Sequence, residues 1–164
     1  MSEQQFSLDA EQIAFREVIR KFAEDKIAPY AADSDHNSAY SWESFKALQQ
    51  MELTALSYPV EYGGSGASLV TQSVVAEELA RVCASTSLMF LISKLGMLPV
   101  INFGSEALKA KYLPRICTGE SQASYGLSEA DAGSDVASMT THAEKDGDSW
   151  VINAKYACAF AGRR

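Results

Sequence analysis

The sequence predicts an α+β protein in which an all-α helical bundle precedes an antiparallel β-region. Two observations predict this order. Apolar residues recur at helical spacing through most of the first 120 residues, whereas residues 136–152 read as two short strands around a turn. Because helices come first and strands follow without alternation, the two should form separate regions. We therefore expect a helical domain over residues 1–120 and an incomplete β-domain over residues 121–164.

The first two helices are predicted from their caps and their apolar spacing. Asp9 can accept hydrogen bonds from the N–H groups ahead of it, and Pro29 is expected to end the helix that follows. Residues 33–40 read as a loop, after which Ser41 can cap a second helix. The apolar residues at helical spacing are Ile13, Phe15, Val18, Ile19, Phe22 and Ile27 in the first helix and Trp42, Phe45, Leu48 and Met51 in the second.

Two further helices have the same kind of start signal. Ser68 can cap a third helix. Its apolar residues should face the core, and Glu77, Glu78 and Arg81 should face outward. Ser105 can cap another that runs through Ile116 and is closed by Gly119.

Residues 88–103 are apolar almost throughout. A membrane span needs about 20 apolar residues, and this run is shorter and contains Lys94 and Pro99. We therefore expect a buried helix here and no membrane span.

A glycine-rich link, Tyr62-Gly63-Gly64-Ser65-Gly66, precedes the third helix. Its spacing is not the G-x-G-x-x-G of a dinucleotide-binding turn, and no Lys-Ser/Thr pair follows as in a phosphate-binding P-loop. The link therefore argues against a Rossmann unit.

Charge and cysteine content exclude several classes of protein. The net charge of -7 leaves little with which to neutralise nucleic acid phosphates. Cys83, Cys117 and Cys158 are odd in number and widely spaced, which fits neither a disulfide framework nor a zinc site. The polar, acidic start contains no secretory signal. We expect a reducing, cytoplasmic-type compartment.

The segment from Ser124 to Asp135 contains most of the functional information. Residues 123–127 read as a strand that runs into a polar loop, in which Ser128 and Ser134 offer hydroxyls and the glycines allow close approach of the backbone to a ligand. Such a surface suits a polar, planar or phosphorylated ligand, although segments of this composition are often simple turns. The acids do not form a calcium pattern, and we expect no metal site.

Read as a whole, Tyr125-Gly126-Leu127-Ser128-Glu129 followed by Ala132-Gly133-Ser134-Asp135 resembles the flavin-binding signature of the acyl-CoA dehydrogenase family, Y-x-L-[ST]-E-x-x-A-G-S-D. The resemblance continues in the Y-G-G-x-G turn at residues 62–66, the G-[ST]-E-x-x-K-x-x-Y-L-P segment that ends at Pro114, and the D-G-D hairpin at residues 146–148. It covers the chain from about Leu8 to Asn153 in the family's order.

The resemblance implies a helical N-terminal domain followed by the truncated start of an antiparallel β-barrel domain. It implies FAD as cofactor and the α,β-dehydrogenation of an acyl-CoA thioester to the 2-enoyl-CoA, with an electron-transfer flavoprotein as acceptor. Full-length relatives form tetramers, and the catalytic glutamate comes from a C-terminal domain, so no residue here is assigned as the base. The implied flavin contacts are Tyr125, Gly126, Leu127, Ser128, Glu129, Gly133 and Ser134, and the implied substrate contacts are Ser134, Leu95, Gly96 and Leu98.

The end of the chain departs from the family. Relatives continue with N-G-x-K-x-[WF]-I-T-N, whereas this chain lacks the aromatic-Ile-Thr triplet after Asn153. We expect a truncated fragment with an altered tail, inactive alone and marginally stable, located in a bacterial cytoplasm or, in a eukaryote, the mitochondrial matrix. Two alternatives stay open: a non-catalytic helical binding module derived from the family, and a relative of the acyl-CoA oxidases.

Overall fold

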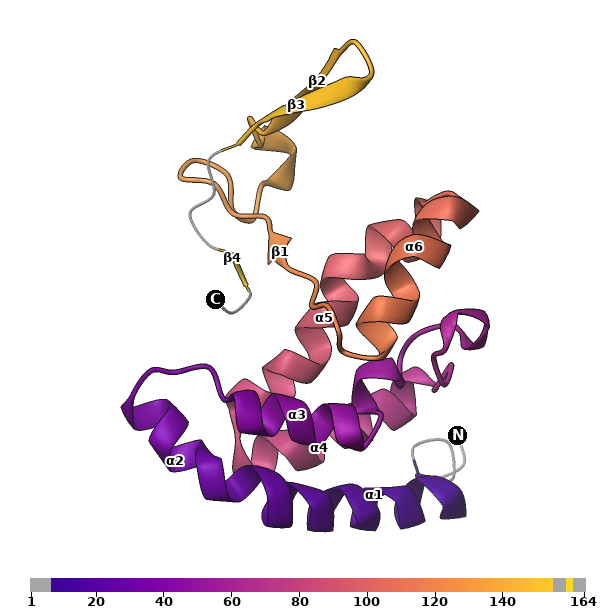
Figure 1. Cartoon of the computed structure of the whole chain (residues 1–164). Coiled ribbons are helices and arrows are strands. Elements are labelled where there is room, and N and C mark those ends of the chain that lie inside the picture. The colour runs from indigo at the N-terminus through magenta and orange to yellow at the C-terminus, as the bar shows by residue number, and fades with distance from the viewer. Residues whose placement is uncertain (1–6, 155–158, 161–164) are drawn as a thin grey trace. The chain divides into compact units, whose positions relative to one another are not determined.

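The computed structural model describes residues 7–154 and 159–160 (Figure 1). The chain divides into two compact units, Met1–Ala123 and Ser124–Arg164. The first is helical and the second contains short antiparallel strands, which confirms the α+β class. The altered tail predicted from the sequence falls mostly on residues 155–158 and 161–164, outside the described residues.

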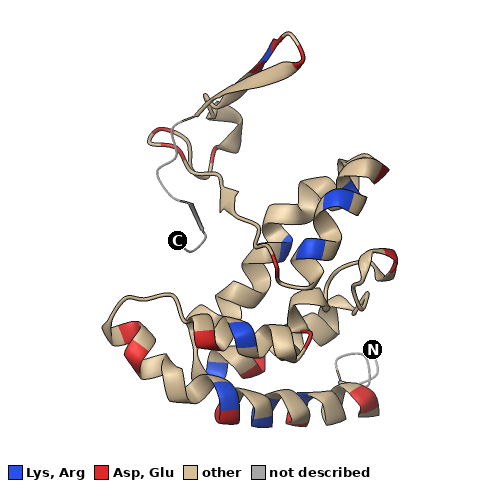
Figure 2. Ribbon diagram, in the orientation of Figure 1, with Lys and Arg blue, Asp and Glu red and all other residues tan. Residues whose placement is uncertain are grey.

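Among the described residues 7–123, the helical unit contains six α-helices joined by turns. They are α1 (Ala10–Phe22), α2 (Ala28–His36), α3 (Trp42–Gln50), α4 (Leu69–Val82), α5 (Ala84–Phe103) and α6 (Glu106–Cys117), with a π-helical turn at Ala23–Ile27 and 3-10 turns at Leu53–Ala55 and Val60–Tyr62. Residues of both charges occur along α1, whereas the charged residues coloured on α2 are both Asp (Figure 2).

All four predicted helix caps are confirmed. The Asp9 carboxylate accepts from the Gln12 amide at 2.7 Å and forms a capping box. The Ser41, Ser68 and Ser105 hydroxyls accept from the amides three residues ahead, at 3.2, 3.1 and 3.3 Å. These bonds satisfy N–H groups that the first turn leaves free, so the sequence places helix starts well.

The prediction that Pro29 ends the first helix is wrong. The chain passes from α1 through the π-turn into α2, and Pro29 lies in the first turn of α2, where its missing N–H is not needed. The helix continues to His36, so the loop predicted at residues 33–40 begins four residues later than expected, at Asn37.

The outward placement of Glu78 is also wrong. Its side chain is only 2% exposed and lies against α1, where Arg20 pairs with it. The apolar core of this region includes Ile19, Ala23, Ile27, Leu48, Leu53, Val75, Leu79 and Phe90. A second apolar cluster includes Tyr58, Met97, Leu113, Ile116 and Cys117.

The helix α5 is only partly buried, against the prediction. Phe90 and Met97 face the core, whereas Leu88, Leu91 and Leu95 are exposed. Of the described helices, α5 is the one long and apolar enough to cross a membrane by length and composition, a test that core helices of soluble proteins also meet; 17% of its apolar window is buried.

In the part of the second unit that the structure describes, two antiparallel strand pairs are present. The hairpin pairs β2 (His142–Asp146) with β3 (Ser149–Asn153), with Lys145 opposite Trp150 and Gly147 in the turn at a φ of 57°. The hairpin prediction is confirmed, but the first strand begins at His142, because Val136–Ser138 forms a 3-10 turn. The strand predicted at residues 123–127 shrinks to β1 (Tyr125–Gly126), which pairs with β4 (Ala159–Phe160).

Candidate functional site

The loop that follows β1 is held by its own backbone. The amide of Glu129 donates to the carbonyl of Ala132 at 2.9 Å, which closes a tight turn. The Ala132 side chain is buried, so the middle of the turn packs inward. Ser128 and Gly133 lie immediately outside the two ends of this turn.

The carboxylate of Glu129 has three hydrogen-bond donors. Its Oε2 accepts from the Thr140 amide at 2.8 Å and the Thr140 hydroxyl at 2.7 Å, and its Oε1 accepts from the Thr141 amide at 2.8 Å. The neighbouring Thr141 hydroxyl and these Thr140 donors lower the pKa of Glu129 to about 2. The group is therefore ionised at neutral pH, and its lone pairs are occupied within the chain.

The other polar candidates in the loop are uncommitted. Within the described residues, no hydrogen bond engages the hydroxyl of Ser128 or Ser134. Gly133 is exposed, and a Cβ built on it would meet nothing within 4 Å, so its backbone is open to a ligand. Hydroxyls and open backbone N–H groups suit the polar edge of a flavin or a diphosphate, and the donor set fits FAD.

The acids beside these donors do not form a cation site. The Asp135 carboxylate accepts from the Ser138 hydroxyl, and Glu129 is occupied as described. Among residues 7–154 no group of three or more His, Cys, Asp or Glu side chains could hold a metal ion.

The substrate candidates lie in the helical unit. Leu95, Gly96 and Leu98 occupy the second half of α5, with Leu95 exposed and the other two half-buried. The adjacent Lys94 was not among the site residues expected from the sequence, and its Nζ donates to the Gln72 side chain at 2.8 Å. Partial burial lowers the pKa of Lys94. Its signal in the sequence was its position as the one charged residue of α5.

Two further features of the site were not predicted from the sequence. Thr140 and Thr141 complete the contacts of Glu129, although their only sequence signal was a threonine pair before the hairpin. In addition, β4 in the altered tail pairs with β1, with Tyr125 opposite Phe160. A strand therefore lies beside the start of the loop even though the family's triplet is missing.

Comparison with known proteins matches residues 9–120 to the family described as acyl-CoA dehydrogenase, N-terminal domain. A probable acyl-CoA dehydrogenase of Mycobacterium leprae is 46% identical over 148 residues, which cover 90% of this chain and 38% of that protein. The structure of a glutaryl-coenzyme A dehydrogenase with glutaryl-CoA aligns with a TM-score of 0.85 and 31% identity, covering 94% of this chain and 40% of that one.

A third relative comes from work on the electron transferring flavoprotein of Acidaminococcus fermentans. That structure aligns with a TM-score of 0.83 and 28% identity, over 91% of this chain and 40% of that one. This chain therefore spans about two fifths of the length of these three relatives.

Proposed function

Since this chain belongs to the acyl-CoA dehydrogenase family, we propose that it contributes an FAD-binding loop to the α,β-dehydrogenation of an acyl-CoA thioester. The proposal rests on which polar groups of the loop are open to a ligand and which are hydrogen-bonded within the chain. Ser128 and Gly133 are open to a ligand, while both carboxylate oxygens of the buried Glu129 between them accept hydrogen bonds from within the chain.

FAD held by this loop would supply the acceptor for the hydride that leaves the carbon β to the thioester carbonyl. The Ser128 hydroxyl and nearby backbone groups stabilise negative charge at the edge of the isoalloxazine. The backbone at Gly133 and the Ser134 hydroxyl approach the diphosphate and the substrate. No residue of this chain is assigned as the base, which the family resemblance places in a C-terminal helical domain.

The remaining roles are proposed on the same resemblance. Leu95, Gly96 and Leu98 border the acyl chain, and the complete enzyme passes electrons to an electron-transfer flavoprotein and forms a tetramer. A bacterial cytoplasm or a mitochondrial matrix is the proposed compartment, because the free thiols of Cys83 and Cys117 suit a reducing environment.

The test is a flavin titration of this chain, followed by absorbance and by quenching of flavin fluorescence. We expect saturable binding that Ser128→Ala weakens about fivefold to tenfold, the effect of one lost hydrogen bond. Ser73→Ala is the matched control, because it removes an exposed hydroxyl of α4 that bonds only the backbone. Equal binding by both variants, or none by the unmodified chain, would contradict the proposal, and the latter would favour a non-catalytic binding module.

A further inference from the structure

We infer that Glu129 is a positioning residue, which fixes the conformation of the loop from Ser128 to Gly133 without itself touching the flavin. The inference rests on the proposed function for the identity of the ligand. Its structural part rests on the hydrogen bonds of Glu129 with Thr140, Thr141 and Ala132.

The carboxylate of Glu129 is directed into the protein. Both of its oxygens accept hydrogen bonds from a segment 11 to 12 residues further along the chain. The residue as a whole is 9% exposed, so little of it remains available to a ligand. A group turned into the chain in this way acts on a ligand through the loop that it holds.

The hydrogen bonds of Glu129 lie between the two groups that we propose meet the cofactor. Glu129 also closes the turn to Ala132 through its amide, so one residue fixes the loop from both its backbone and its side chain. Ser128 precedes Glu129 directly, and Gly133 directly follows Ala132. The two groups proposed to meet the cofactor thus border the fixed turn on either side.

The three hydrogen bonds to Glu129 require an ionised carboxylate. Two backbone amides and one hydroxyl all donate to the carboxylate, and such bonds to an ionised acceptor are short and strong. A neutral amide of the same shape offers one acceptor oxygen and would direct its own N–H groups at one of these donors. Glu129→Gln therefore keeps the shape of the side chain and removes the function.

The experiment combines FAD titration with amide hydrogen exchange on the full chain. In Glu129→Gln we expect faster exchange of the Thr140 and Thr141 amides, FAD affinity reduced at least about fivefold, and an altered visible spectrum of the bound flavin. Thr140→Val should have a weaker effect of the same kind, and Thr140→Ser, which restores the hydroxyl, should recover it. Glu144→Gln is the control, because it removes an exposed carboxylate of β2.

The outcomes separate this inference from the proposed function. If the unmodified chain binds FAD and Glu129→Gln binds it equally well, the positioning role is overturned while the flavin site stands. If the unmodified chain does not bind FAD, hydrogen exchange decides alone. Unchanged exchange at Thr140 and Thr141 in Glu129→Gln overturns the inference, and faster exchange supports the role of Glu129 in holding the loop.

Discussion

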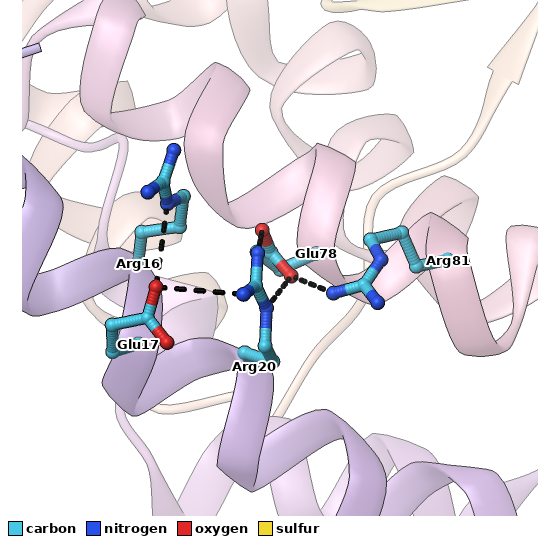
Figure 3. A network of polar contacts seen from close by, with 5 residues as sticks. All are labelled: Arg16, Glu17, Arg20, Glu78 and Arg81. Atoms are coloured by element: carbon cyan, nitrogen blue, oxygen red, sulfur yellow. Dashed lines mark hydrogen bonds and ion pairs between the residues drawn. The ribbon is translucent and has the colours of Figure 1, made fainter.

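Arg20 of α1 donates two hydrogen bonds to the buried carboxylate of Glu78 of α4, from Nε at 3.1 Å and from Nη2 at 2.9 Å (Figure 3). Arg81 reaches the same carboxylate with its Nη1 at 2.8 Å, while Glu17 contacts Arg20 at 3.5 Å. Arg20 also remains 36% exposed, so its charge stays partly solvated. The pair links two helices that are distant in sequence and fixes their packing at a point where the sequence suggested only surface.

Replacement of Glu78 should destabilise the helical unit. Glu78→Gln keeps the shape but loses hydrogen bonds to two charged groups, which should lower the free energy of unfolding by roughly 1–3 kcal/mol. Glu17→Gln is the matched control, and it should change stability by less than about 0.5 kcal/mol because that carboxylate is exposed. Urea unfolding followed by helical circular dichroism measures both. Equal effects of the two substitutions would show that the buried pair adds nothing.

Acid should weaken the chain through the same carboxylate. Hydrogen bonds from Arg20 hold the pKa of Glu78 below its ordinary value of 4.5. Because the folded-state pKa is depressed, the contribution is complete above pH 4.5 and is lost as the pH falls through the lower folded-state value. Melting temperatures between pH 7 and pH 3 should therefore fall below about pH 4.5 and fall less steeply in Glu78→Gln. Parallel curves would contradict this assignment.

Acid should loosen the candidate flavin loop over a wider range. The pKa of Glu129 is lowered to about 2, so its bonds to Thr140 and Thr141 should weaken as the pH falls from 4.5 toward 2. The Thr141 amide should become progressively less protected from hydrogen exchange over that interval, after correction for the intrinsic rate. In Glu129→Gln its protection should not depend on pH.

Two adjacent glycines should differ sharply in their tolerance of alanine. A Cβ on Gly64 would overlap the backbone carbonyl of Tyr58, against which the turn folds, whereas one on Gly63 would meet open space. Gly63 has a φ of 88°, so Gly63→Ala should cost about 1 kcal/mol from backbone strain alone. Gly64→Ala should cost more than about 3 kcal/mol, because the backbone must move. Thermal melts compare them, and a similar cost would show that the turn is free to shift.

The thiols should differ in reactivity. Burial raises the pKa of Cys117, which is 5% exposed, whereas Cys83 is half-buried. Alkylation by iodoacetamide needs an accessible thiolate, so Cys117 should react at least about fivefold more slowly than Cys83 in the folded chain. Peptide mass mapping over time measures the two rates, and the difference should vanish in urea. A difference that persists in urea would not come from the fold.

The sequence by itself determined the features that depend on neighbours along the chain. The caps at Asp9 and Ser68 act on amides three residues away, and the turn at Gly147 needs only a residue that accepts a positive φ. The signature from Tyr125 to Asp135 likewise identifies the family without a structure.

Tertiary structure decided what depends on contacts between distant residues. Glu78 looked like a surface residue until Arg20, 58 positions earlier, was placed against it. Glu129 looked like a loop acid until the chain returned with Thr140, and β4 became recognisable only when it paired with β1. The physical reason is that a side chain's burial and partners depend on which segments pack together, whereas helix caps and turns are set within a few residues.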